Sequence, residues 1–239
     1  MRLRLIRHAT VVIATGGKTL LVDPMLDAAG ARPPIPDTPS PRDNPLVELP
    51  EPAERIVEGI DAVLVTHLHQ DHLDDTAIRV LPKDVPLFCA PGDSDRLRAL
   101  GFRDVRAVDD SVEWEGVRLT RTDGVHGVLG PTPGFVIDSL YIAGDTIWCD
   151  EVRAALAAHR PDVIVVNAGG ARFLEGDPLV MTIDDVVAVA RHAPDSRVVA
   201  VHLEAINHCL ETRADLRRRL DDEGLAGRVA VPDDGAEVQ

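Results

Sequence analysis

The segment THLHQDHLDD, residues 66–75, places three of the chain's nine histidines and an aspartate within six positions. These residues are His67, His69, Asp71 and His72, and they follow the apolar run DAVLV. Alternate side chains of an extended chain face the same way, so His67 and His69 can address one point, and the turn that follows brings Asp71 and His72 near a second. Because crowded histidines repel one another once protonated, the segment predicts a metal site for Zn²⁺, Mn²⁺ or Fe. A solvated, histidine-rich helix start is the alternative.

Three further residues of the same chemistry follow strand-like runs. His126 lies in DGVHGV, Asp145 in LYIAGDT, and His202 at the end of the apolar run VVAVH. Functional residues of layered α/β folds commonly gather on loops at one edge of a sheet, held by rigid strands. We therefore expect these three residues to join the histidine-rich segment.

The order of expected elements predicts an α/β layered fold. Residues 3–14 and 19–23 read as strands joined by the turn TGGK, and the second half alternates strands with helices, one of which has Thr182 as its N-cap. This pattern predicts layered sheets with helices outside, in a single domain over residues 1–239. Residues 27–52 contain eight prolines and no periodicity, and we interpret them as an ordered flap, with a tolerated surface insertion as the alternative.

Composition narrows the classes of partner. A net charge of −15 opposes the binding of polyanions, so we expect no nucleic-acid surface. No apolar run has the length of a membrane span, and the opening MRLRLIRHAT lacks the features of a signal peptide. Three distant cysteines are typical of reduced thiols in a cytoplasmic protein. We expect a small-molecule substrate and no membrane partner; homo-oligomerisation stays open.

The pattern H-x-H-x-D-H at residues 67–72, with the later His, Asp and His, resembles the signature of the metallo-β-lactamase-fold hydrolases. The resemblance covers about residues 1–210 and implies an αββα sandwich with metals at one edge. The chain is similar to the branch that contains ascorbate-6-phosphate lactonase in the segments RHATVVI and LLVDP. It differs from that branch at three places: Arg7 replaces a glycine, AVHLEAINH stands where the branch usually has Pro-x-His, and the flap has no counterpart.

The resemblance also implies a set of metal ligands for two divalent cations, Zn or Mn first and Fe as a further candidate. The first metal would be bound by His67, His69 and His126. The second metal would be bound by Asp71, His72 and His202. Asp145 would bridge the two metals.

Such a site predicts a hydrolase that uses a metal-bridging hydroxide to attack an ester, a lactone or a phosphoester. The resemblance to the branch implies that a small lactone or ester, of a phosphorylated or sugar-acid metabolite, ranks first. Asp71 can orient the hydroxide, and the candidate proton donors are His8, His208 and Glu204. Asp23 is expected to hydrogen-bond a ligand imidazole. The alternatives are a phosphodiesterase or nuclease of the same fold, and a non-catalytic module that binds metal or ligand.

Overall fold

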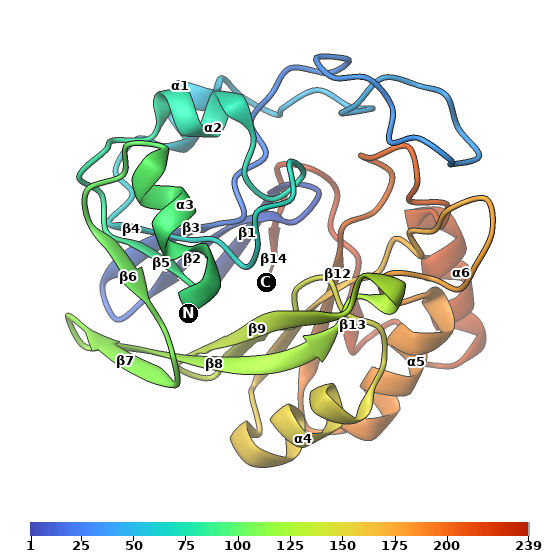
Figure 1. Cartoon of the computed structure of the whole chain (residues 1–239). Coiled ribbons are helices and arrows are strands. Elements are labelled where there is room, and N and C mark those ends of the chain that lie inside the picture. Colours follow the sequence, from blue (N-terminus) through green and yellow to red (C-terminus); the bar gives the residue numbers. More distant parts are fainter. Residues whose placement is uncertain (239) are drawn as a thin grey trace.

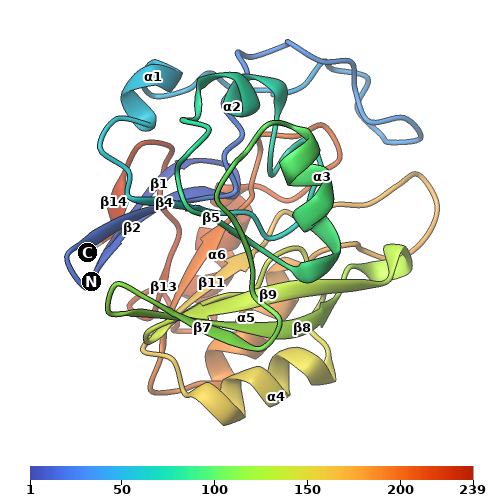
Figure 2. The same cartoon turned by 60° about the vertical axis from the view of Figure 1, so that its left-hand side comes forward.

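The structure, a computed structural model, describes residues 1–238 and contains two β-sheets that face each other (Figures 1 and 2). In this part of the chain the first sheet has seven strands in the order β14-β1-β2-β3-β4-β5-β6. Its strands are β1 (Arg2–Arg7), β2 (Thr10–Thr15), β3 (Lys18–Val22), β4 (Ala62–Leu64), β5 (Leu87–Cys89), β6 (Val105–Ala107) and β14 (Glu237–Val238).

The second sheet of the described residues also has seven strands, in the order β13-β12-β11-β10-β9-β8-β7. Its strands are β7 (Ser111–Trp114), β8 (Val117–Val125), β9 (Pro131–Ile137), β10 (Leu140–Ile142), β11 (Val163–Asn167), β12 (Arg197–Val201) and β13 (Val229–Ala230). Each sheet is antiparallel on one side and parallel on the other, since β3 to β6 run parallel and so do β10 to β13.

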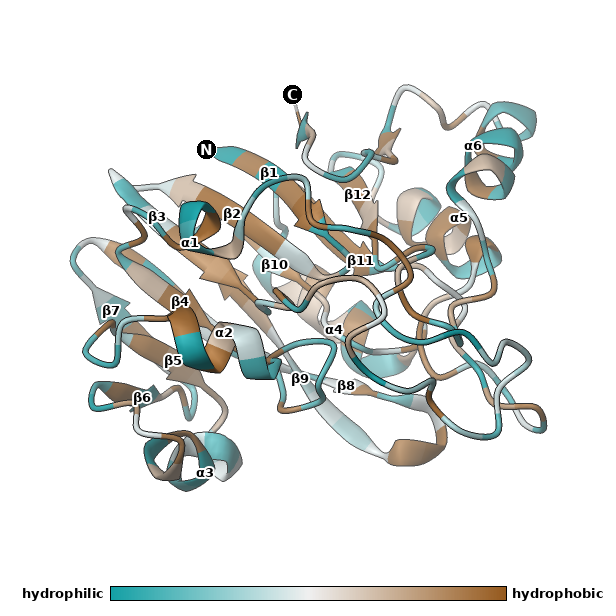
Figure 3. Cartoon of the chain, turned by 90° about the horizontal axis from the view of Figure 1, so that it is seen from above, coloured by the Kyte–Doolittle hydropathy of each residue, from teal (hydrophilic) through white to brown (hydrophobic). Residues whose placement is uncertain are grey.

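Helices cover the outer faces of both sheets (Figure 2). The helices of the described residues are α1 (Ala53–Ile56), α2 (Asp75–Val80), α3 (Ser94–Ala99), α4 (Asp150–His159), α5 (Ile183–His192) and α6 (Arg213–Asp222), with 3₁₀ turns η1 (Pro91–Asp93) and η2 (Gly127–Leu129). Buried side chains from both sheets, among them Leu5, Ile13, Phe135 and Val199, form the core between them. In Figure 3 the central strands of both sheets are largely apolar. The predicted αββα sandwich is confirmed. Of the described helices, none combines the length and apolar character needed to cross a membrane.

Helix α5 begins at the N-cap that the sequence predicts. The Thr182 side chain accepts a hydrogen bond from the Asp185 amide, and the Asp185 carboxylate accepts one from the Thr182 amide, which completes a capping box. Both contacts satisfy amides that the first helical turn leaves without partners.

We expect Thr182→Ala to lower the free energy of unfolding by about 1 kcal/mol, because the Asp185 amide loses its acceptor. Urea unfolding followed by circular dichroism measures the change. Thr182→Ser keeps the hydroxyl and is the matched control, so an equal loss in both variants would mean that the cap hydrogen bond is not the cause.

The first strand predicted from the sequence is in fact two strands. Residues 3–14 form β1 and β2, which pair antiparallel and are joined by a tight turn at His8 and Ala9. His8 has φ of 60°, a region that residues other than glycine rarely adopt. Its carbonyl accepts a hydrogen bond of 2.9 Å from the amide of His202, which itself has φ of 66°. The turn therefore depends on a contact with the far sheet, which local strand propensity does not reveal.

The short strands β7, β13 and β14 were not predicted from the sequence either.

The flap, residues 27–52, crosses one end of the sandwich as an extended, irregular segment (blue in Figure 1). The buried guanidinium of Arg7 donates to the carbonyl oxygens of Met25, Asp27 and Val47 at distances of 2.8–2.9 Å. Within the flap, Arg32 and Asn44 exchange two backbone hydrogen bonds. These contacts describe an ordered segment with both ends attached to the sheet.

Candidate metal centre

The seven predicted ligands lie at one edge of the sandwich, where strands from both sheets end. His67, His69, Asp71 and His72 form the loop between β4 and α2. The remaining three follow the ends of β8, β10 and β12; these are His126, Asp145 and His202. Because parallel strands point their carboxyl ends the same way, residues far apart in sequence meet there. The structure brings all seven together.

A first group of potential ligands consists of His67, His69, His126 and Asp145, whose ligand atoms lie within 4.8 Å of one another. The His67 Nε2 and His69 Nδ1 atoms are 2.9 Å apart, so they face the same point. The Asp145 Oδ2 atom lies 3.4 Å from His126 Nε2 and 3.8 Å from His67 Nε2. This geometry presents three nitrogens and one oxygen to a small volume.

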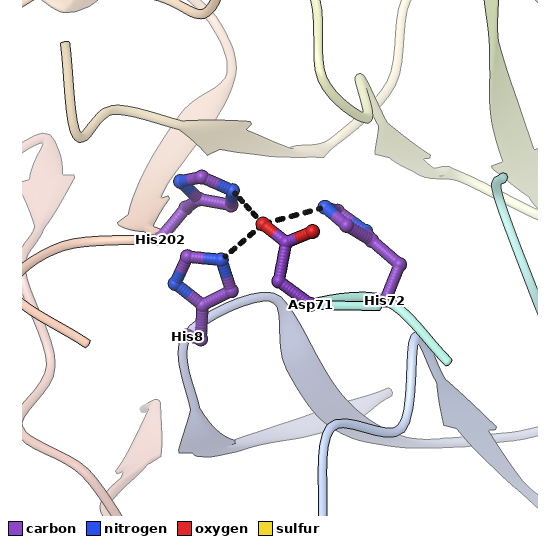
Figure 4. Close-up of side chains that lie close together, drawn as sticks. All are labelled: His8, Asp71, His72 and His202. Carbon is purple, nitrogen blue, oxygen red and sulfur yellow. Dashed lines mark hydrogen bonds and ion pairs between the residues drawn. The ribbon is translucent and has the colours of Figure 1, made fainter. Parts of the chain in front are cut away.

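A second group consists of His8, Asp71, His72 and His202, all buried (Figure 4). Figure 4 shows the Asp71 carboxylate between the three rings, and its Oδ2 atom lies 3.1 Å from His8 Nε2, 3.6 Å from His202 Nε2 and 3.9 Å from His72 Nε2. Asp145 connects the two groups, because its carboxylate oxygens also lie 3.3 Å from the Nε2 atoms of His72 and His202.

Partners behind the ligands fix their orientation. Asp23 accepts hydrogen bonds from the Thr66 amide and hydroxyl and lies 2.8 Å from His72 Nδ1, as the sequence predicts for this residue. His126 Nδ1 lies 2.9 Å from the carbonyl oxygen of Leu179. When the Nδ1 atom of an imidazole is occupied in this way, its Nε2 atom is presented to the centre.

Two further partners were missed by sequence reasoning. Asn167, the last residue of β11, donates a hydrogen bond of 2.6 Å to Asp145 Oδ1, and the Cys209 thiol lies 3.5 Å from His202 Nδ1. Asn167 lies at a strand end, as the ligands do, so its position in the sequence could have indicated that it belongs to the site. Cys209 lies in a loop, and no local pattern marks it.

The residues present fit divalent cations. Within residues 1–238, the Nε2 atoms of His72 and His202 are buried and have no hydrogen-bond partner, although both face carboxylate oxygens. A donor set of imidazole nitrogens and carboxylate oxygens suits Zn²⁺, Mn²⁺ and Fe. Nitrogens that are buried, unsatisfied and convergent are costly unless a ligand binds them. The cluster therefore has the chemistry of a metal site.

The charges of the cluster also support a metal site. Burial opposes ionisation of Asp145, but the surrounding histidines outweigh it and hold the pKa of its carboxyl well below the usual range. Burial also opposes the charged form of His202, yet Asp145 and other neighbours raise the pKa of that imidazole to about 10. The buried carboxylates therefore favour positive charge at this place, and bound cations would supply it.

The three predicted proton donors have different surroundings. His8 is fully buried behind Asp71, with its ring centroid 3.6 Å from that of His202, and is not among the residues that line the cavity. His208 lines the cavity, and burial lowers the pKa of its imidazole. Glu204 forms a 2.6 Å ion pair with Arg213 instead of facing the cavity, because the loop turns it toward helix α6.

A cavity of about 280 Å³ opens onto the centre. Four of the candidate ligands line it, namely His69, Asp71, His126 and Asp145. Much of the remaining wall is apolar and comes from the flap and from three loops, with Pro33, Ile35, Leu129, Phe173, Leu179 and Ile206. The cavity therefore offers a small molecule a wall of mixed polar and apolar side chains beside the candidate metal ligands.

We expect Asp23→Asn to weaken metal binding about 10- to 100-fold, because the amide cannot hold His72 Nδ1 as the carboxylate does. Competition with a chromophoric chelator measures the affinity. Asp162→Asn, at an exposed position, is the matched control. Unchanged affinity in Asp23→Asn would show that His72 is oriented by other contacts.

Comparison with known proteins assigns the family. Residues 18–203 match the model of the beta-lactamase superfamily domain, Lactamase_B_2. The chain belongs to the beta-lactamase superfamily. Within this superfamily, it is 37% identical over 250 residues to the UPF0173 protein YddR of Bacillus subtilis (strain 168), with 98% of each chain covered.

Two solved structures of the superfamily fold are similar over the whole chain. The crystal structure of a possible metal-dependent hydrolase from Veillonella parvula DSM 2008 has a TM-score of 0.96 and 31% identity, covering 100% of this chain and 98% of that one. The isothiocyanate hydrolase from Delia radicum gut bacteria has a TM-score of 0.95 and 34% identity, covering 100% and 99%. At this level the prediction of a metal-dependent hydrolase of the metallo-β-lactamase fold is confirmed.

Proposed function

We propose that the chain hydrolyses small uncharged electrophiles, and that isothiocyanates are the substrate class that fits best. The observation that carries the proposal is the cavity, in which six apolar side chains lie in the same wall as Asp71 and Asp145. An isothiocyanate has an apolar substituent, no charge and an electrophilic carbon between nitrogen and sulfur. The full-length similarity to an isothiocyanate hydrolase supports the same class.

The proposed reaction is R–N=C=S + H₂O → R–NH₂ + COS. Water adds to the central carbon, both of its protons end on the nitrogen, and the carbon–nitrogen bond breaks to release the amine and carbonyl sulfide. Two divalent cations held by the two ligand groups would supply Lewis acidity and make water nucleophilic near neutral pH. Asp71 lines the cavity and would orient that water through its carboxylate.

We assign proton handling in the cavity to His208 and a positioning role to His8. The lowered pKa of His208 keeps its imidazole neutral at pH 7, so it can accept a proton and return it to the leaving nitrogen. His8 contacts Asp71 from behind and would hold the carboxylate in place. Both assignments refine the sequence expectation, in which His8 and His208 are candidate proton donors.

A small lactone or ester is the second candidate, and a cation in the cavity wall favours it. Arg32 lines the cavity, and in residues 1–238 its Nη2 atom is buried without a hydrogen-bond partner. A guanidinium pairs well with the carboxylate or phosphate of a sugar-acid or phosphorylated lactone. The resemblance to the ascorbate-6-phosphate lactonase branch supports this candidate too.

The test is a substrate panel on protein loaded with Zn²⁺ or Mn²⁺. Allyl and benzyl isothiocyanate, two lactones with and without a carboxylate, and bis-p-nitrophenyl phosphate are compared at equal concentration. We expect amine release from the isothiocyanates at the highest kcat/KM. Hydrolysis of the phosphodiester alone would replace this proposal with a phosphodiesterase, and a metal-loaded protein inactive on all of them would favour a binding module.

A further inference from the structure

One amide side chain, that of Asn207, attaches the middle of the flap to the rest of the protein. Its Oδ1 atom accepts from the Ile35 amide at 3.0 Å and from the Asn44 side chain at 2.7 Å. Its Nδ2 atom lies within 3.2 Å of the Ile35 carbonyl, the Thr38 hydroxyl and the Ser40 carbonyl. The Asn207 amide donates to Asn44 Oδ1 at 2.8 Å. Asn207 therefore satisfies polar groups along ten residues of the flap.

Asn207 occupies a place that links the flap to the metal centre. Its neighbours Ile206 and His208 both line the cavity, and His202 lies five residues earlier in the same loop. The Ala205 carbonyl accepts from the Leu46 amide at 2.7 Å, which adds a backbone contact beside the side-chain contacts. In Figure 1 this orange-red loop lies beneath the blue flap.

Two of the flap residues that Asn207 holds form part of the cavity wall. Ile35 and Asn44 line the cavity directly. Arg32 also lines it, and its backbone is fixed by the two hydrogen bonds with Asn44. The guanidinium of Arg7 holds only the two ends of the flap, at Met25, Asp27 and Val47. Asn207 therefore holds this part of the wall, together with the hydrogen bond of 2.7 Å from the Leu174 amide to the Asp37 carbonyl oxygen.

The alternative is a flap that opens and closes freely as a lid. Asn207 is 1% exposed and Asn44 is 3% exposed, so the contacts between them are shielded from water. Opening would leave the Ile35 amide and both asparagine side chains to find new partners at once. The packing favours a fixed wall over a free lid.

We propose that Asn207 is a positioning residue that fixes the flap as a rigid wall of the cavity and thereby limits the size of the substrate. The proposal rests on the proposed function only in that the cavity receives the substrate. It assigns selectivity for small molecules to a residue that touches neither the cations nor the reacting atoms.

The test compares Asn207→Ala with Asn207→Asp in metal-loaded full-length protein. Alanine removes every side-chain contact, whereas aspartate keeps the oxygen that accepts from Ile35 and Asn44 and loses the Nδ2 donor. Asp43→Asn, at an exposed flap residue next to Asn44, is the matched control. Aspartate keeps the test open should the alanine variant fail to fold.

Two measurements are made on each protein after its metal content is shown to equal that of the wild type. Hydrogen exchange reports the protection of the Arg32, Ile35, Asn44 and Leu46 amides. Calorimetric titration with acetohydroxamic acid and 2-naphthohydroxamic acid reports selectivity, since hydroxamates bind metal ions through the same group and differ here in bulk. This second measurement does not require hydrolysis, so it stands whether or not isothiocyanates are substrates.

We expect these amides to exchange about 10-fold faster in Asn207→Ala, with a smaller effect in Asn207→Asp. We also expect the preference for the small hydroxamate over the bulky one to fall about 10-fold, the range that one misplaced wall contact gives. Asp43→Asn should match the wild type in both. Unchanged exchange in both variants, or faster exchange with unchanged selectivity, would overturn the proposal.

Discussion

Asp145→Ala is expected to reduce hydrolysis about 10³-fold or more and to lower the number of bound cations per chain. Asp145 is the group that approaches both sets of ligands, with oxygens 3.3–3.4 Å from His72, His126 and His202. Its loss removes the shared anion and leaves several imidazoles facing one another. Activity assays and metal analysis by mass spectrometry check the two parts separately.

Two further variants serve as comparisons for Asp145→Ala. Asp145→Asn keeps the shape and one acceptor but removes the charge, so it should bind metal more weakly than the wild type and more strongly than Asp145→Ala. Asp162→Asn, an exposed carboxylate far along the chain from the ligand loops, should be unaffected. Full metal content in Asp145→Ala would contradict the bridging role.

Removal of the cations by a chelator is expected to abolish activity and to destabilise the fold. A cation present at 1,000 times its dissociation constant contributes about 4 kcal/mol to the free energy of unfolding, and that contribution disappears with it. Zn²⁺, Mn²⁺ and Fe²⁺ are then added back one at a time, which ranks them by restored activity. Activity that survives complete removal of metal would contradict a metal-dependent reaction.

The chelated protein should also differ in how its stability depends on pH. Burial opposes the charge on His202, yet Asp145 and its neighbours raise the pKa of this imidazole to about 10. A group with a raised folded pKa stabilises fully below its unfolded value near 6.5, and this contribution is lost as the pH rises to about 10. Urea unfolding at pH 6 and pH 9 should therefore show a larger loss with rising pH in the chelated protein than in the loaded one.

Much of the metal centre could be predicted because its ligands follow strands. The spacing of His67, His69, Asp71 and His72 is local, and an extended chain turning into a helix explains it. His126 and His202 were predictable because each follows a strand-like run, and the ends of such runs converge in a layered fold. Convergence of all the ligands at one edge followed from the fold class.

The rest of the site depends on contacts that the sequence does not encode locally. The turn at His8 is stabilised by a hydrogen bond to His202, nearly two hundred positions away. Strand propensity does not reveal such a contact, so the sequence predicted one continuous strand over residues 3–14. Cys209 and Asn207 act across loops whose path is set by packing. Glu204 was expected near the leaving group, but the salt bridge with Arg213 draws it away.

Arg7 attaches both ends of the flap to the first sheet, and Asn207 attaches the middle of the flap to a loop of the second sheet. The segment between residues 28 and 46, here called the cassette, can therefore be exchanged as a unit. Exchange of this cassette between relatives would alter which molecules are admitted while the cations and their ligands stay in place. A protein built in this way can acquire new substrates through changes in about twenty positions, without repeating the evolution of its chemistry.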